Sequence, residues 1–134
     1  MKFFHKSKDG GSESNVTGYW LIEWKKCFSI VLLRFDKGSR EAFHNHAFNA
    51  VSWILSGALL EEARENGFTR WKALLPSPLP IYTSRDRMHK VYGAADRTWA
   101  LSFRGPWNLY WKEHFVSDEG TKEVTLTHGR KVIE

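Results

Sequence analysis

Two histidines one residue apart, His44 and His46, are the residues whose types and spacing most clearly could do chemistry. Side chains at positions i and i+2 of an extended strand project to the same face, so both imidazoles can address one point. A transition-metal ion is the simplest occupant of that point, because neutral imidazole is a common ligand of such ions. The alternative is a pair of structural or surface histidines that are satisfied by hydrogen bonds.

The residues around the pair form a longer pattern. Gly38 precedes His44 with five intervening residues, and ten residues separate His46 from Gly57. This spacing resembles the first motif of the cupin superfamily, and His89 stands where the second motif puts its histidine. The resemblance therefore gives His44, His46 and His89 as three metal ligands, which would leave coordination positions open for water or substrate.

The resemblance runs from about residue 33 to 115 and is greatest for the small, uncharacterised, single-domain cupins of bacteriophages and bacteria. Their usual elements stand here as residues 44–48 (His-Asn-His-Ala-Phe), 52–57 (Ser-Trp-Ile-Leu-Ser-Gly) and 103–106 (Phe-Arg-Gly-Pro). It implies a single all-β domain over residues 1–134, with the double-stranded β-helix or jelly-roll barrel of cupins.

The sequence departs from the superfamily in two places. A glutamate often follows the second histidine by three or four residues, but Asn49 and Ala50 stand there, so a carboxylate ligand is missing from its usual place. Ser84 and Asp86 replace the proline and the glycine of the second motif. What remains is similar to the three-histidine subset of cupins, of which the thiol dioxygenases are the best-known enzymes.

A divalent transition metal is therefore the expected cofactor. Fe(II) is favoured, since the resemblance to thiol dioxygenases implies that substrate and dioxygen bind side by side on iron. Zinc, manganese and nickel are the alternatives, because the relative affinities of these ions do not decide which one occupies a site in the cell. Zinc would imply hydrolysis or isomerisation through a polarised oxygen.

Three functional hypotheses follow. The first is a dioxygenase-like oxidoreductase that acts on a small polar or anionic molecule. The second is a non-enzymatic module that binds a small ligand or a protein on the same barrel. The third is a metal-dependent isomerase or epimerase, for which the sequence identifies no acid or base beside the metal. Small cupins often pair through edge strands, so a homodimer is expected by analogy alone.

Residues 98–104 predict a strand whose even-numbered side chains would line the cavity, which would place Ser102 and Arg104 inside. An arginine there could hold a carboxylate or a phosphate through two parallel hydrogen bonds. A surface arginine at a strand end is the commoner outcome. Trp53 could form a wall of the pocket, although packing between sheets is the commoner environment of such a residue.

Tyr82 and Arg87 lie on the approach to His89, and strand alternation puts Arg87 on the same face as this histidine. Both are candidates for contacts with the substrate. Glu61 and Glu62 follow the first motif and indicate a solvated strand. One of these two carboxylates is an alternative candidate for a hydrogen bond to a metal ligand.

The composition fits one domain of ordinary size. Of the 134 residues, 42% are hydrophobic and 26% are charged, which is typical of a globular protein with its own core. The net charge of +5 could favour anionic partners. The basic residues are spread along the chain, however, and no nucleic-acid motif occurs, so nucleic acid is not an expected partner.

The single cysteine, Cys27, excludes an intrachain disulfide and fits a reducing compartment. No segment is apolar over a length that could span a bilayer, and the first residues lack the apolar run of a signal peptide. We therefore expect no membrane partner and a cytoplasmic location, which would be the host cytoplasm if the protein is phage-encoded.

Short strands separated by turn signals predict an antiparallel sandwich or barrel. Residues 5–16 are polar and rich in Gly and Ser, which predicts a flexible loop. Residues 19–24 and 28–35 predict a hairpin, and Asn66-Gly67 predicts another because it tolerates the left-handed backbone of tight turns. A polar tail is expected after a turn at residues 117–120.

Overall fold

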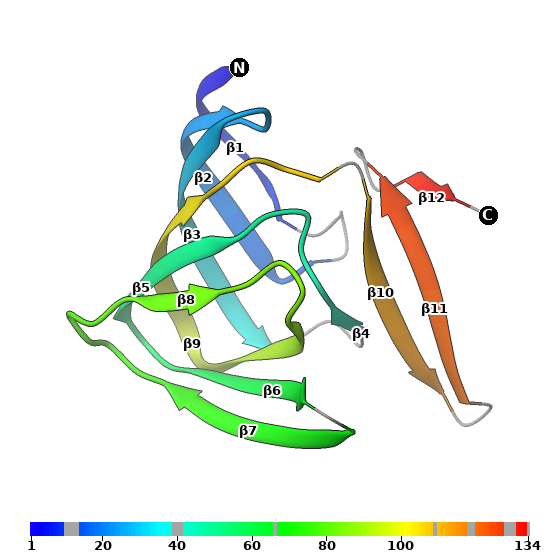
Figure 1. Ribbon diagram of the computed structural model, residues 1–134. Coiled ribbons are helices and arrows are strands. Elements are labelled where there is room, and N and C mark those ends of the chain that lie inside the picture. The colour runs from blue at the N-terminus through cyan, green and yellow to red at the C-terminus, as the bar shows by residue number, and fades with distance from the viewer. Residues whose placement is uncertain are drawn as a thin grey trace.

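The computed structural model describes residues 1–9, 14–38, 42–65, 67–108, 110–117, 120–127 and 131–133, and in these ranges its regular elements are all strands (Figure 1). In chain order the strands are β1 (Lys2–Lys8), β2 (Val16–Trp24), β3 (Phe28–Gly38), β4 (Ala42–His44), β5 (Ala50–Ser56), β6 (Leu59–Glu65), β7 (Phe68–Leu74), β8 (Ile81–Thr83), β9 (Met88–Arg104), β10 (Tyr110–Ser117), β11 (Gly120–Thr127) and β12 (Lys131–Ile133). Within these ranges no helix has the length and apolar character needed to cross a membrane.

Strand β9 organises the barrel because it pairs along both of its edges. β3 runs antiparallel along one edge, and β5 followed by β6 runs along the other. β4 continues the first edge through a single pair, in which His44 lies opposite His89. Two candidate ligands therefore face each other across adjacent strands.

Strands β10, β11 and β12 form an arm beside the barrel (Figure 1). Among the described strand pairings, the arm joins the barrel through β4, which pairs with residues 113–115 of β10. Strands β2 to β9 thus form the barrel. The arm extends the sheet from β4, the strand that carries His44.

The inward face of β9 changes along its 17 residues. Near its start the buried positions are odd-numbered, with His89 and Gly93, and near its end they are even-numbered, from Thr98 to Arg104. Between Gly93 and Arg97 the pairing with β3 is irregular. Such irregularities re-aim the side chains that follow them, so both ends of one strand contribute to the same interior.

The barrel interior is hollow. Its buried apolar cluster consists of Trp20, Val31, Leu33, Ile54, Leu59, Leu74 and Ala100. All of these except Val31 also line a cavity of about 660 Å³. The apolar side chains therefore pack around the central space and leave room for a small molecule.

The all-β antiparallel architecture and both predicted hairpins are confirmed, the hairpins being β2 with β3 and β6 with β7. The predicted loop at residues 5–16 is wrong for its first part, because β1 extends to Lys8 and pairs with β2. The side chains of β1 are mostly exposed, so this strand is held by backbone hydrogen bonds to β2. Its sequence therefore lacks the apolar alternation that would predict a strand.

The predicted polar tail is also wrong, because β11 and β12 follow β10 as paired strands. Residues 120–127 read Gly-Thr-Lys-Glu-Val-Thr-Leu-Thr. The β-branched residues in this segment favour the strand conformation even though its overall character is polar.

Two glycines that follow strands have a left-handed backbone, but one is closely packed and the other is not. Gly57 has φ +87° and follows β5, where an added Cβ would lie 2.5 Å from both the carbonyl oxygen of Arg97 and the hydroxyl of Thr98. That hydroxyl is itself bound to the backbone of Ala58, at 3.0 Å from its nitrogen and from its oxygen. Gly67 has φ +82° and open space around it.

We expect Gly67→Ala to lower the free energy of unfolding by about 1–2 kcal/mol, the cost of a left-handed backbone for an L-residue. Gly57→Ala should add to this cost about 1–3 kcal/mol for overpacking. Urea denaturation of the two variants measures the difference. Equal destabilisation by both substitutions would contradict the close packing described for Gly57.

Candidate metal centre

Three imidazole rings converge inside the barrel. The ring centroids of His44, His46 and His89 lie 4.9 to 5.0 Å apart, and the rings are steeply inclined to one another, at 63° to 86°. One nitrogen from each ring lies within 4.8 Å of the others, and Nε2 of His46 is 3.5 Å from Nε2 of His89. The structure therefore brings together the three histidines that the sequence suggests as ligands.

The two histidines of the first motif are positioned differently. His44 ends β4 and faces His89 in the sheet register. His46 lies beyond the strand end, and its backbone nitrogen donates a hydrogen bond to the carbonyl oxygen of Arg85 at 3.2 Å. Asn49 accepts a hydrogen bond from the backbone nitrogen of Arg85 at 2.8 Å. The residue at the usual glutamate position thus supports the loop that holds His46.

Glu61 supplies a carboxylate behind the cluster. Its Oε2 lies 2.8 Å from Nδ1 of His89, and both side chains are buried. Its other oxygen, Oε1, accepts a hydrogen bond from Arg87 at 2.7 Å. A carboxylate that accepts the Nδ1 proton leaves the Nε2 lone pair of a neutral imidazole available, which is the usual second hydrogen bond of a metal-bound histidine.

The charge of Glu61 is stabilised where it lies. Burial by itself raises the pKa of this carboxyl, but the hydrogen bond and charge of His89 and those of Arg87 outweigh the burial. The pKa of Glu61 is therefore lowered from its ordinary value, and the group is an anion at neutral pH. The expectation of a solvated strand is wrong for Glu61, and the alternative, a partner of a candidate ligand, is what the geometry shows.

The donor set fits a divalent transition metal. Metal–nitrogen bonds of about 2.1 Å put neighbouring donors roughly 3 Å apart, and the nitrogens of His46 and His89 are 3.5 Å apart. The nitrogens of the whole set, His44 included, lie within 4.8 Å of one another. The rings stand on the wall of the cavity of about 660 Å³, so ligand positions on the cavity side would be accessible to a small molecule.

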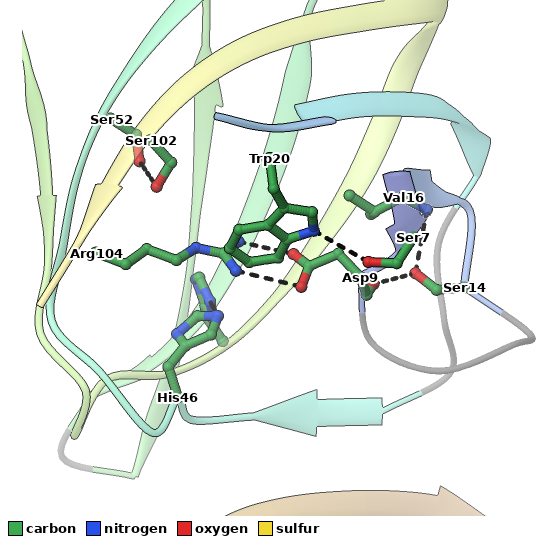
Figure 2. Close-up of polar contacts among 10 residues, drawn as sticks. Ser7, Asp9, Ser14, Val16, Trp20, His46, Ser52, Ser102 and Arg104 are labelled. Carbon is green, nitrogen blue, oxygen red and sulfur yellow. Dashed lines mark hydrogen bonds and ion pairs between the residues drawn. The ribbon is translucent and has the colours of Figure 1, made fainter. Parts of the chain in front are cut away.

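Arg104 and Asp9 form an ion pair inside this cavity. Nη1 of Arg104 donates to Oδ1 of Asp9 at 3.2 Å, and Nη2 donates to Oδ2 at 2.7 Å. Figure 2 shows the side chain of Arg104 pointing toward the carboxylate of Asp9, with Trp20 beside the guanidinium. The guanidinium carbon lies 5.2 Å from the ring centroid of Trp20 and 4.5 Å from that of Phe48. Sequence reasoning missed Asp9, which lies in the segment expected to be a loop.

Ser102 also faces the cavity, as the even-numbered face of the strand predicts. Its hydroxyl is buried and hydrogen-bonded to the hydroxyl of Ser52 at 3.0 Å (Figure 2). Arg104 is 5% exposed, so the expectation of a surface arginine at a strand end is wrong, and the cavity alternative is the one observed.

Two other candidates lie outside the main cavity. Tyr82 is 63% exposed, because its neighbours Ile81 and Thr83 take the inward positions of β8. Trp53 packs edge-on against Phe103 at 5.6 Å and does not line the cavity, since it stands on the outward face of β5. Neither side chain therefore lines this cavity, and a contact of either one with a substrate stays a prediction.

Arg87 contacts the site from behind. Its guanidinium binds Glu61 and is about one-third exposed, and the residue does not line the cavity. Strand alternation placed it correctly near His89, but it reaches this histidine through Glu61. We therefore describe Arg87 as part of a chain of polar contacts from His89 to solvent.

Solved structures with a similar fold include a sugar phosphate isomerase of the cupin superfamily from Silicibacter pomeroyi. The TM-score is 0.63 at 12% identity, and the match covers 98% of this chain and 88% of that one. A cupin superfamily protein from Desulfitobacterium hafniense has a TM-score of 0.55 at 17% identity, with 72% and 83% of the two chains covered. The chain has the cupin fold.

Fe(II) HppE is also similar to this cupin barrel, with a TM-score of 0.60 at 12% identity over 75% of this chain. The match covers 55% of the HppE chain, so the cupin barrel described here spans about half the length of that protein. No family model matches the sequence and no curated protein matches it. Sequence identities this low establish the fold and do not establish an activity.

We expect Glu61→Gln to weaken metal binding about 10- to 100-fold, the usual cost of losing a hydrogen-bond partner behind a metal ligand. The matched control is Glu62→Gln. Glu62 is the next residue of β6 and accepts a hydrogen bond from Tyr92 at 3.2 Å, away from the cluster. Competition with a chromogenic chelator measures both affinities. Equal affinities in the two variants would show that Glu61 does not support a ligand.

Proposed function

We propose that this protein is a metal-dependent enzyme, a dioxygenase-like oxidoreductase that acts on a small anionic molecule. One observation carries the proposal. Three imidazoles meet on the wall of a cavity, and one of them is hydrogen-bonded to a buried carboxylate that fixes its tautomer. Histidines that served packing alone would not need an anion held behind them.

His44, His46 and His89 would hold a divalent transition metal. Fe(II) is favoured over zinc, manganese and nickel, in line with the three-histidine resemblance, and HppE structures with a similar fold contain Fe(II) or Co(II). When bound, such an ion would supply Lewis-acid and one-electron chemistry at its open positions. The similarity to thiol dioxygenases stays a prediction.

The chain itself would bind and orient the substrate. Arg104 offers a cationic, planar fork of donors to an anionic group. The hydroxyls of Ser52 and Ser102 give polar anchors on the same cavity wall. The apolar side chains around them, including Trp20 and Phe48, exclude water and so strengthen each polar contact.

The spacing of these parts suits a small molecule. The ring centroid of Phe48 lies 5.1 Å from that of His46 and 4.5 Å from the guanidinium carbon of Arg104. The candidate metal position and the anion-binding arginine are thus separated by about one aromatic ring. A substrate with a metal-binding group at one end and an anionic group at the other would reach both.

We expect about one equivalent of a divalent transition metal in protein purified without oxygen, by analogy with sites of three protein ligands. A His44→Ala, His89→Ala double variant should contain almost none. His5→Gln is the matched control, because His5 lines the same cavity but lies outside the cluster. Elemental analysis decides, and near-zero metal in wild type and double variant alike would leave a non-enzymatic binding module.

Dioxygen consumption distinguishes the oxidoreductase from an isomerase or epimerase on the same barrel. Small thiols that carry a carboxylate should support oxygen uptake by the iron-loaded protein. Arg104→Gln should raise KM by about 10-fold or more, since it removes a charged partner of the substrate. Conversion of a substrate without oxygen uptake would favour isomerisation.

A further inference from the structure

We propose that Asp9 is an internal anion that occupies the substrate's place on Arg104, and that the anionic group of the substrate displaces it. This inference rests on the proposed function for the identity of the displacing molecule. It adds a competitor to the site, because substrate affinity would then depend on how firmly Asp9 holds the arginine.

The buried guanidinium of Arg104 requires an anionic partner. A guanidinium does not lose its proton in proteins, and this one is 5% exposed. A buried charge without a partner is strongly unfavourable. If Asp9 leaves, another anion must replace it, and a neutral molecule of the same size would leave the arginine unpaired.

Asp9 is the partner that can move. Its side chain is 26% exposed, whereas that of Arg104 is 5% exposed and lies against the rings of Trp20 and Phe48. The backbone of Asp9 is fixed, because its nitrogen donates to the carbonyl oxygen of Val16 and its oxygen accepts from the hydroxyl of Ser14, at 2.9 and 2.6 Å. A side-chain rotation of Asp9 toward solvent would remove its carboxylate from the arginine without moving this backbone.

Arg104 has donor capacity that Asp9 does not use. The two oxygens of Asp9 bind Nη1 and Nη2, while Nε of Arg104 is buried and has no hydrogen-bond partner in the described part of the chain. An anion that binds the side of the guanidinium could accept from Nε and from one Nη nitrogen, because these two N–H bonds are parallel. Such an anion would satisfy a donor that Asp9 leaves unused.

The charge of the cavity wall also favours an anion. Among the residues that the structure describes, five lysines line it in addition to Arg104, and they are Lys2, Lys6, Lys8, Lys25 and Lys90. The described carboxylates that line it are Asp9, Glu23 and Glu61. Glu61 is bound to His89 and Arg87, and Glu23 lies 3.4 Å from Nε2 of His5. Asp9 is the one of the three that pairs with Arg104, so its displacement would leave this arginine open to a negative ligand.

Titration calorimetry with inorganic phosphate tests the proposal. We expect Asp9→Asn to bind phosphate about 10-fold more tightly than wild type or better, because the amide keeps the size of the side chain and removes its charge. Asp36→Asn is the matched control. Asp36 forms an ion pair with Arg34 at 3.3 Å and does not line the cavity, so this variant should bind phosphate as wild type does.

Arg104→Gln should abolish the binding of phosphate in both the wild-type and the Asp9→Asn background. A melting curve for each variant shows whether it is folded, and the Asp9→Asn comparison stands even if Arg104→Gln is not. Binding by Asp9→Asn that is equal to or weaker than that of wild type would overturn the proposal. Acetate in place of phosphate should show the same dependence on Asp9 at lower affinity, because it carries less negative charge.

The same titration in the His44→Ala, His89→Ala background separates this inference from the proposed function. The effect of Asp9→Asn should persist there, because the anion site is Arg104 and not a metal. If the effect persists and wild-type protein contains no metal, the enzyme proposal fails and this inference stands. If the effect is absent from metal-containing protein, the inference fails alone.

Discussion

The change of inward face within β9 is the constraint on which the site depends. His89 and Arg104 stand at an odd-numbered and an even-numbered position of the same strand, so one uninterrupted alternation would turn one of them outward. The irregular pairing between residues 93 and 97 removes this conflict. The strand can then follow β6 at its start and β5 at its end while both side chains face the same cavity.

The cavity contains two buried charges of opposite sign, and each has its own partners. Glu61 is held between His89 and Arg87, and Arg104 is held by Asp9. In a region with little water each pair is stronger than on the surface, and each would be costly to break without a replacement. The interior is therefore polar at defined points and apolar elsewhere, which is how a protein selects one orientation of a small ligand.

The local pattern of the sequence predicts much of this arrangement. The i, i+2 spacing of His44 and His46 and the cupin resemblance that adds His89 lead to the cluster. The even-numbered face of residues 98–104 leads to Arg104. Glu61 had a usable signal, because Leu59 and Ala63 flank it on one face of β6 and both are buried. A carboxylate between two buried apolar positions of a strand points inward.

Asp9 had no such signal. β1 is exposed and forms because the edge of β2 offers backbone hydrogen bonds, a long-range cause that hydrophobic periodicity does not report. The outward positions of Tyr82 and Trp53 have a related cause, since a pattern of alternation fixes which residues share a face but not which face is inside. That choice is made by the packing of the whole barrel.

The short strand β4 has a consequence for how motion could spread through the molecule. It is three residues long, with β10 along one edge and His89 opposite His44 on the other. Backbone opening at the base of the arm would therefore remove a hydrogen-bonded neighbour from the strand that aims His44. Amide exchange of β10 and the electronic spectrum of a bound cobalt ion would then change together. The stability of the C-terminal arm would in this way affect the geometry of the histidine cluster.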